Sequence, residues 1–299
     1  MDATVHQSVN KFSGVNNVDL ATRLFPVPIN HEYVYPLSQA VNVEIDNTFG
    51  ISSRDGYTEV LSGTSIHSMW SDGVTCLFVD GETLYQMDSI YEKTSIRSVS
   101  LGPRMSYANC NDRIYYTNNH EIGYVKKGAD NPLVDPEREF KSPLPAGKFI
   151  EYFRGCLYVA KNNILYISDP LCDYYDVRTG YRIFAEDLTM LRAVDEGLYV
   201  SDDRVWFIKG KGNDEFERDE AYPVRAISYT DVRVSGKHVD DGLAGDVAMW
   251  TSNNGICLGD NSGKVINLTE ARYAFTATGQ GTGFIRDKSN VKHYINTLY

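Results

Sequence analysis

The stretch that decides the fold is Gly155–Ser168, GCLYVAKNNILYIS, which has the pattern of a strand, a tight polar turn and a second strand. Four other stretches repeat this unit and open at Gly73, Asp112, Gly197 and Gly255, so that successive openings lie 39, 43, 42 and 58 residues apart. A period near 40 residues that is built on strand pairs is the sequence pattern of a β-propeller. The chain is therefore predicted to be an all-β repeat protein.

Each of these hairpins is preceded by a leading strand. The leading strands are expected at SIHSMW (65–70), MSYANC (105–110), KFIEYF (148–153), TMLRAV (189–194) and DVAMWT (246–251). The turns that follow are rich in Asp, Asn and Gly, which tolerate the positive φ that tight hairpins need. Aromatic side chains recur in the last strand, at Tyr85, Tyr124, Tyr166 and Trp206, where they are expected to pack one blade on the next.

Both ends of the chain offer strands that could close the ring. Val41, Val43 and Ile45 alternate with polar residues and Ile51–Leu61 follows as a second strand, while 291–295 alternates near the C-terminus. Five full repeats and one blade closed by N- and C-terminal strands predict six blades, and five or seven are left open.

The domain organisation follows from where the periodicity begins and where it is interrupted. Residues 1–40 have no stable periodicity and are predicted to form an extended N-terminal arm, before a β-propeller at 41–299. Three segments, 131–145, 169–184 and 210–246, interrupt the repeats and are interpreted as inserts on the faces of the propeller.

Composition limits the function. The net charge is −11, from 29 basic and 40 acidic residues, and no run of Lys or Arg is longer than two, so tight sequence-independent binding of nucleic acid is not expected. An acidic surface does suit a protein past which DNA moves without adhering. The sequence has neither a long apolar run nor a secretory signal pattern. The five cysteines, an odd number without a CxxC pair, are interpreted as reduced core thiols.

The sequence shows no cluster of catalytic or metal-ligating residues. The six histidines are scattered, and neither a G-x-S-x-G elbow nor a P-loop is present. The glycine-rich run at 279–283 is interpreted as a bend, and Asp202-Asp203 and Asp240-Asp241 lie in turns or inserts without calcium-loop spacing. The expectation is that the protein is not an enzyme and has no cofactor or metal. Paired acids that converge from different blades, as in a glycosidase, are left open.

Three elements near the N-terminus resemble a virion protein family of tailed bacteriophages, the tail nozzle or hub proteins of short-tailed phages. They are a G-x-N-N-V-D element at Gly14–Asp19, an A-V-N-V-x-I-D strand at Ala40–Asp46 and an R-x-G-Y-T turn at Arg54–Thr58. The later run at 166–208, from YISDPLCDYYDVRTGY to VWFI, is similar to the central section of the same family.

The resemblance implies a structural component of a phage tail, located in the virion and made in the host cytoplasm. Its partners would be further copies of itself in a ring, with six copies expected, together with portal, adaptor and other tail proteins. Genomic DNA would pass through the ring without specific binding, and no membrane would be involved. The candidate subunit contacts lie in the arm and in the second insert: Asn16, Asn17, Asp19, Arg23, Phe25, Tyr174, Tyr175 and Tyr181.

An alternative function is a propeller that binds a host surface or a glycan. In it, Tyr174, Tyr175 and Tyr181 would stack on sugar rings while nearby Asp and Arg side chains make hydrogen bonds. A glycosidase or depolymerase ranks below this alternative.

Overall fold

The structure is a computed structural model that describes residues 11–19, 24–29, 32–46, 48–56, 58–240, 242–270, 272–273, 279–288 and 291–298. Nearly all regular elements are β-strands, and the short 3-10 helix η2 (Gly236–His238) is the one helix in these ranges. The chain divides into two compact units. The first comprises Met1–Glu59, Asn254–Ile256 and Asn267–Thr276, and the second comprises Val60–Asn253, Cys257–Ile266 and Ala277–Tyr299.

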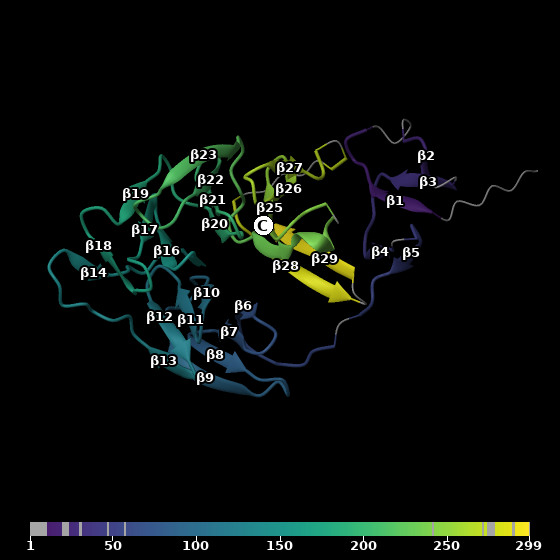
Figure 1. Cartoon of the computed structure of the whole chain (residues 1–299). Coiled ribbons are helices and arrows are strands. Elements are labelled where there is room, and N and C mark those ends of the chain that lie inside the picture. The colour runs from purple at the N-terminus through teal and green to yellow at the C-terminus, as the bar shows by residue number, and fades with distance from the viewer. Residues whose placement is uncertain are drawn as a thin grey trace, which may run out of the picture. The chain divides into compact units, whose positions relative to one another are not determined.

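Five four-stranded sheets follow one another along the described part of the chain, and Figure 1 shows them in succession from blue to yellow-green. The first sheet has β6 (Ile66–Ser71), β7 (Cys76–Asp80), β8 (Thr83–Met87) and β9 (Lys93–Ser98), and the second has β10 (Ser106–Cys110), β11 (Arg113–Thr117), β12 (Ile122–Lys126) and β13 (Ala129–Asn131). The third sheet has β15 (Phe149–Phe153), β16 (Cys156–Lys161), β17 (Ile164–Ile167) and β19 (Tyr181–Ile183), and the fourth has β20 (Met190–Ala193), β21 (Leu198–Ser201), β22 (Val205–Lys209) and β23 (Glu217–Tyr222). The fifth sheet has β24 (Val232–Ser235), β25 (Asp246–Ser252), β26 (Gly255–Gly259) and β27 (Val265–Asn267). A four-stranded sheet whose strands pair in chain order is the blade of a β-propeller. The predicted fold class, an all-β propeller, is confirmed.

The hairpin that decided the fold forms as predicted. β16 and β17 pair antiparallel, with Lys161 opposite Ile164 at the closed end. Asn162 occupies the turn with φ of 53°, a conformation that asparagine tolerates better than most residues. Tyr158 of β16 is almost completely buried in the core between the third and fourth sheets, so it packs these two blades together.

Apolar side chains between neighbouring sheets form the core. Separate clusters of buried residues fill the spaces between sheets one and two, two and three, three and four, and four and five. Trp250 is fully buried between the fourth and fifth sheets, with its ring 5.4 Å from that of Tyr199. Burial of one large apolar side chain contributes about 1.5–3 kcal/mol, so packing between blades is the main stabilising interaction of the propeller.

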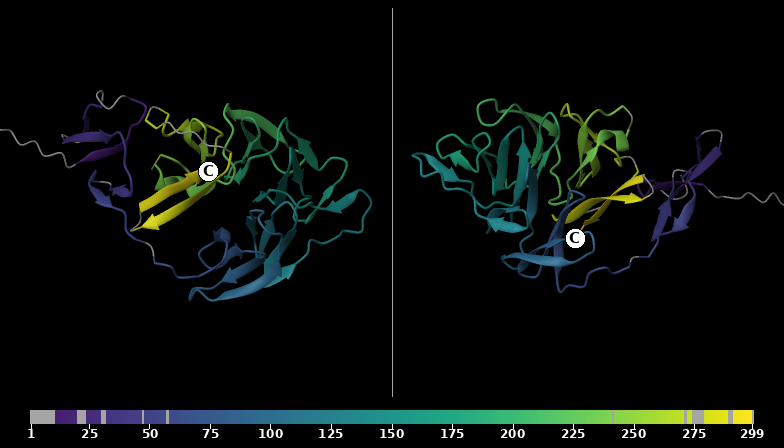
Figure 2. Two further views of the ribbon diagram at one scale, coloured as in Figure 1. Left: turned by 180° about the vertical axis from the view of Figure 1, so that it is seen from behind. Right: turned by 60° about the horizontal axis from the view of Figure 1, so that its bottom comes forward.

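The first strands of successive sheets line the inside of the propeller. β10, β15, β20 and β24 lie next to one another in this order, and β28 (Gly281–Lys288) lies next to β24. The N–H groups of Gly281 and Gly283 donate to the carbonyls of Ser228 and Tyr229, each at 3.0 Å. β28 pairs along its whole length with β29 (Val291–Leu298). Figure 2 shows this hairpin in yellow from two further sides.

The fifth repeat corrects the sequence interpretation. DVAMWT, predicted to be a leading strand, is the second strand β25, and the leading strand is β24. The step of 58 residues is long because the segment 210–246 contains both β23, the last strand of the fourth sheet, and β24. β24 has only four residues between polar segments, which is too short for a visible alternation. The segment 169–184 similarly contains β19, the last strand of the third sheet.

The remaining strands form small separate sheets. In the first compact unit, β1 (Phe12–Val15), β3 (Glu32–Leu37) and β2 (Val27–Ile29) form one sheet, and β4 (Val43–Ile45) pairs with β5 (Ile51–Ser53). The segment predicted as an extended arm therefore contains a three-stranded sheet. In the second unit, β14 (Lys141–Pro143) pairs with β18 (Tyr174–Asp176).

The described strands do not form the predicted shared blade. β4 and β5 pair with each other, β28 and β29 pair with each other, and these are two separate two-stranded sheets. Five four-stranded sheets do not confirm the predicted number of six blades.

Candidate functional site

A cavity of about 720 Å³ lies inside the propeller. Its walls are formed by β6, by the residues before and at the start of β10, by Phe149 of β15, by Arg192 of β20, by the residues just before β24 and by β28. Its size falls within the range of pockets that hold small ligands. First strands of different blades therefore converge on one concave site.

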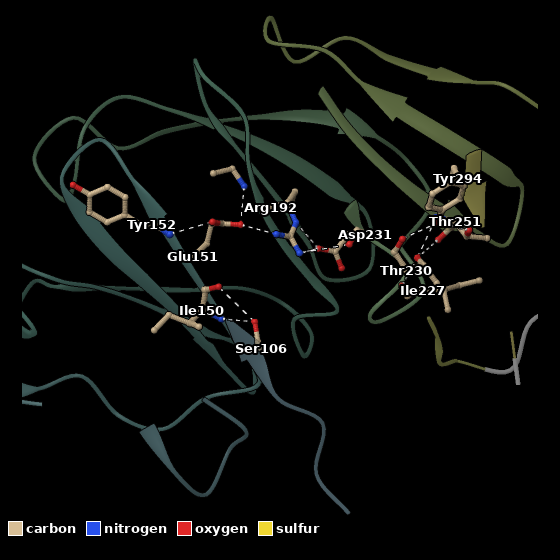
Figure 3. A network of polar contacts seen from close by, with 11 residues as sticks. Ser106, Ile150, Glu151, Tyr152, Arg192, Ile227, Thr230, Asp231, Thr251 and Tyr294 are labelled. Atoms are coloured by element: carbon tan, nitrogen blue, oxygen red, sulfur yellow. Dashed lines mark hydrogen bonds and ion pairs between the residues drawn. The ribbon is translucent and has the colours of Figure 1, made fainter. Parts of the chain in front are cut away.

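Arg192 is held at this site by carboxylates from both neighbouring sheets. Its Nε and Nη2 lie 2.9 and 2.8 Å from Oδ2 of Asp231, and its Nη1 donates to Oε2 of Glu151 at 3.1 Å. Figure 3 shows the three side chains in a row. Burial alone would lower the pKa of Arg192, but Asp231 and then Glu151 outweigh it, so the pKa is raised and the guanidinium stays charged.

The two carboxylates of this row differ in their surroundings. Burial raises the pKa of Glu151, although Arg192 and the backbone N–H of Ala193 act in the opposite direction. Oε1 of Glu151 also accepts from the N–H of Tyr152 at 3.2 Å. Asp231 lines the cavity, whereas Glu151 lies behind Arg192. The row thus presents one arginine and one aspartate to the cavity.

Tyr229 is surrounded by cationic groups. The guanidinium carbon of Arg104 lies 4.4 Å from the centre of the Tyr229 ring, and Nζ of Lys148 lies 5.4 Å from it. Arg104 also donates to the carbonyl oxygen of Gly281, and Lys148 donates to Oγ of Ser228 at 2.8 Å. The contacts of Arg104 and Lys148 with the Tyr229 ring are of the cation–π type, which is strengthened where water is excluded.

Two residues of the cavity wall have an unusual backbone. Tyr229 has φ of 66° and Ser68 has φ of 54°, in the left-handed region that residues with large side chains rarely adopt. The strain at Ser68 is compensated by its Oγ, which accepts from the N–H of Met105 and contacts Nδ1 of His67, each at 2.8 Å. Such backbone outliers concentrate at functional sites.

Large apolar side chains surround the same cavity without being buried. Ile66 and Met69 of β6, Leu101 before β10 and Phe284 of β28 all line it, and each is exposed. Exposed apolar side chains that gather around a cavity with a few charged groups are typical of a binding site.

The predicted contact residues lie elsewhere, in two groups. Asn16 and Asp19 form one local turn, in which Nδ2 of Asn16 donates to Oδ2 of Asp19 at 3.0 Å. Asn17 donates its backbone N–H to the carbonyl of Arg272 at 3.1 Å, and Phe25 is 74% exposed. Arg23 lies outside the described residues, as do His6, His31 and Asp241.

The three tyrosines of the second group do not form one platform. Tyr175 packs edge-on against Tyr166, with ring centres 5.2 Å apart, and Tyr181 pairs with Tyr166 across β17 and β19. Tyr174 lies opposite Pro143 in the small β14–β18 sheet. Each tyrosine is partly buried.

The charged row of the cavity was missed from the sequence, although a signal was present. Glu151 and Arg192 occupy the same position, the fourth residue, in the leading segments KFIEYF and TMLRAV. A charged residue inside an apolar strand has to be paired, and the opposite signs in successive repeats would have suggested one ion pair between blades.

Other features of the described residues provide less evidence for a function. In the described ranges, no group of three or more His, Cys, Asp and Glu is arranged to hold a metal ion. Across those same ranges no helix has the length and apolar character to span a membrane. All five cysteines are free, and burial raises the pKa of the thiols of Cys76, Cys110 and Cys156.

Comparisons with known proteins agree with the propeller fold. Neither a family model nor a curated protein sequence matches the chain. Similar solved structures include the WD40 β-propeller domain of Doa1, with 13% identity, coverage of 73% of this chain and 71% of that one, and a TM-score of 0.43. A streptogramin B lyase is similar at 14% identity, with coverages of 78% and 83% and a TM-score of 0.44. A gluconolactonase from Xanthomonas campestris is similar at 12% identity, with coverages of 75% and 79% and a TM-score of 0.41.

These similar structures correct one expectation drawn from the sequence. Two of them are enzymes, a lyase and a lactonase, so the prediction that the chain is not an enzyme is contradicted. Short catalytic motifs are a poor guide in propellers, because side chains from separate blades can converge on one site. At these identities, the similarity concerns the fold alone.

Proposed function

We propose that the protein is a structural component of a bacteriophage tail, of the nozzle- or hub-like kind, which assembles as a ring of copies around the DNA exit channel. The observation that supports this proposal is where the family-like elements fall. Gly14–Asp19, Ala40–Asp46 and Arg54–Thr58 all belong to the first compact unit. These three elements therefore lie together in one unit, while the similar run at 166–208 lies in the second unit.

The first unit has the features of a contact surface. Oδ1 of Asn16 accepts from the N–H groups of Val18 and Asp19, each at 3.2 Å, which holds the turn in one conformation. Val18 and Phe25 are exposed on this unit, together with Val27, Tyr33, Val41 and Ile51. Exposed apolar side chains in such number are typical of protein–protein contacts, and aromatic ones often dominate their energy. In a ring of copies, the partner that covers this apolar surface would be a neighbouring copy of the same chain.

The oligomeric state of the full chain tests this proposal. We expect the purified protein to form closed rings by light scattering and electron microscopy, and the double variant Val18→Ser/Phe25→Ser to shift the population to monomers with an unchanged thermal midpoint. Val74→Ser is the matched control, since Val74 is equally apolar and lies exposed in the turn between β6 and β7 of the other unit. A protein that stays monomeric at every concentration, or that virion images place away from the tail axis, would contradict the proposal.

A second candidate function, a propeller that binds a ligand, is favoured by the central cavity. Exposed apolar side chains, the Arg192–Asp231 pair and the strained backbone at Ser68 and Tyr229 meet there. We expect a library of small fragments and oligosaccharides to shift the NMR signals of Ser68 and Tyr229. Shifts confined to Tyr174–Tyr181 would place the binding on the segment from β18 to β19 instead, and no shifts anywhere would contradict this second function.

A further inference from the structure

We infer that the central cavity binds an anionic group, a carboxylate or a phosphate, that is carried on an apolar body. This inference rests on the second candidate function above and names the chemistry of its ligand. Two separate observations support it: the charge around the polar end of the cavity and the position of the exposed apolar side chains.

The polar end has an excess of positive charge. The cavity wall contains two cations, Arg104 and Arg192, and one anion, Asp231, whose carboxylate is already paired with Arg192. Counting the groups just behind the wall, Lys148 adds a cation and Glu151 an anion. The balance is still one positive charge, in a chain whose net charge is −11. A local reversal of sign inside a concave site attracts anions.

Lys148 contributes a largely buried ammonium group to this excess of positive charge. Its ammonium group donates to Ser228 and lies 5.1 Å from the ring centre of Phe149, and no ion pair joins it to an acid within the described residues. Burial, and then the charge of Arg225, lower the pKa of Lys148, while the charges of Asp187 and Asp231 act in the opposite direction. An anion bound beside Tyr229 would stabilise the ammonium form further, because it would bring a negative charge closer to it.

The charge of Arg104 reaches across the cavity to His67. Both residues line the cavity, and after burial the charge of Arg104 is the next cause that lowers the pKa of His67, while Asp80 acts in the opposite direction. An anion placed near Arg104 would offset that charge. His67 therefore provides an internal reporter of the bound group.

The apolar part of the ligand would be held by the exposed side chains of the wall. Ile66, Met69, Leu101 and Phe284 come from three different elements and leave apolar surface open to the cavity. Covering this surface would strengthen binding, because it removes apolar surface from water. An inorganic anion offers no apolar surface to these side chains, which is why the inference includes an apolar body.

The test compares four probes by isothermal titration calorimetry with the full chain: phenyl phosphate, benzoate, phenol and inorganic phosphate. We expect phenyl phosphate or benzoate to bind at least tenfold more tightly than phenol and than inorganic phosphate. The two anionic aromatics distinguish a phosphate from a carboxylate ligand. Binding should also raise the pKa of His67, measured from its ring proton signals by NMR.

Variants locate the binding. Arg104→Gln and Lys148→Gln should each weaken binding of the anionic aromatic at least tenfold without changing that of phenol, whereas the exposed control Arg154→Gln should leave it unchanged. If phenol binds as tightly as the anions, the cavity is a ligand site but the inferred charge preference is wrong. If inorganic phosphate binds as tightly as phenyl phosphate, the apolar body is wrong. If none of the probes binds while other fragments do, or the two cavity variants behave as the control does, the inference is overturned although the ligand-binding function stands.

Discussion

Arg192 and Asp231 join the fourth and fifth sheets of the propeller through two nitrogen atoms of one guanidinium, at 2.9 and 2.8 Å from the same carboxylate oxygen. The third nitrogen reaches Glu151 on the third sheet, so one side chain connects three consecutive sheets. The Asp231 side chain is only 3% exposed and that of Arg192 27%, which places the pair between a core and a cavity. The same contact therefore stabilises the packing of these three blades and shapes the candidate site.

Removal of the guanidinium should destabilise the propeller strongly. Arg192→Met leaves Glu151 and Asp231 buried without their opposite charge, and breaking a buried pair in this way costs about 3–5 kcal/mol. We expect the lower end of that range, about 3 kcal/mol, because Arg192 is partly exposed. The free energy of unfolding in guanidinium chloride measures the effect.

Two further variants show whether the charge is the cause. Arg154→Gln, which breaks an exposed pair with Glu196, should cost less than about 1 kcal/mol. The triple variant Glu151→Gln/Arg192→Met/Asp231→Asn should recover most of the loss that comes from unpaired charge, since a neutral amide costs much less to bury than a carboxylate. A triple variant as unstable as Arg192→Met would show that packing, rather than unpaired charge, is responsible.

The hairpins formed by the second and third strands of the blades could be predicted from the sequence because their signals are local. Gly155–Ser168 contains alternation, a polar turn and a residue that tolerates positive φ, and β16 and β17 form there. The outer strands carry weaker signals. β23, with the sequence ERDEAY, is mostly exposed. It therefore needs no apolar face, and its sequence has no alternation of apolar and polar residues.

The candidate site could not be predicted in the same way, because it is assembled from several separate sheets. Arg104, Arg192, Tyr229 and Phe284 are far apart in sequence and meet only where first strands of different sheets converge. Nothing local marks Tyr229 as a residue with positive φ, since its conformation is held by a hydrogen bond from Gly283. The sequence instead drew attention to the clustered tyrosines at 174–181, whose rings are partly used in packing.

Asp80 should make the stability of the propeller depend on pH in the acidic range. The backbone N–H of Ser65 and then Lys93 lower the pKa of Asp80 from 3.8 to about 2. A carboxyl group with a lowered pKa in the folded state contributes stability that is present above its ordinary pKa and is lost as the pH falls through the folded value. The contribution is therefore complete above about pH 4 and disappears towards about pH 2.

Thermal midpoints measured across this pH range test the assignment. The wild type should be more stable than Asp80→Asn at the upper end of the range, and the two should converge at the lower end. Glu186→Gln, which changes an exposed acid of the same unit, should follow the wild type throughout. A difference between wild type and Asp80→Asn that stays constant with pH would contradict the lowered pKa of Asp80.

The hydroxyl of Tyr294 should stabilise the C-terminal hairpin on the fifth blade. It donates to the carbonyl of Thr230 at 2.7 Å and lies 3.0 Å from Oγ1 of Thr251, as Figure 3 shows. Tyr294→Phe removes both contacts and should cost about 1 kcal/mol. Hydrogen exchange of residues 281–298 should accelerate at the same time. Tyr91→Phe, at an exposed ring of the same unit, should change neither quantity, and equal losses in both variants would argue against the contact.

Gly283 should be a position at which β28 tolerates no side chain. A Cβ atom there would lie 2.1 Å from the carbonyl oxygen of Thr230, while the N–H of the same residue donates to Tyr229. Gly283→Ala therefore has to move β28 away from the segment before β24, and overpacking of this kind costs about 1–3 kcal/mol. Since Gly283 also lines the cavity, any ligand bound there should be lost together with the protection of β28 in hydrogen exchange. Gly56→Ala is the matched control, because a Cβ at Gly56 would meet no atom within 4 Å. Unchanged stability and unchanged exchange in Gly283→Ala would mean that β28 does not pack against Thr230 in solution.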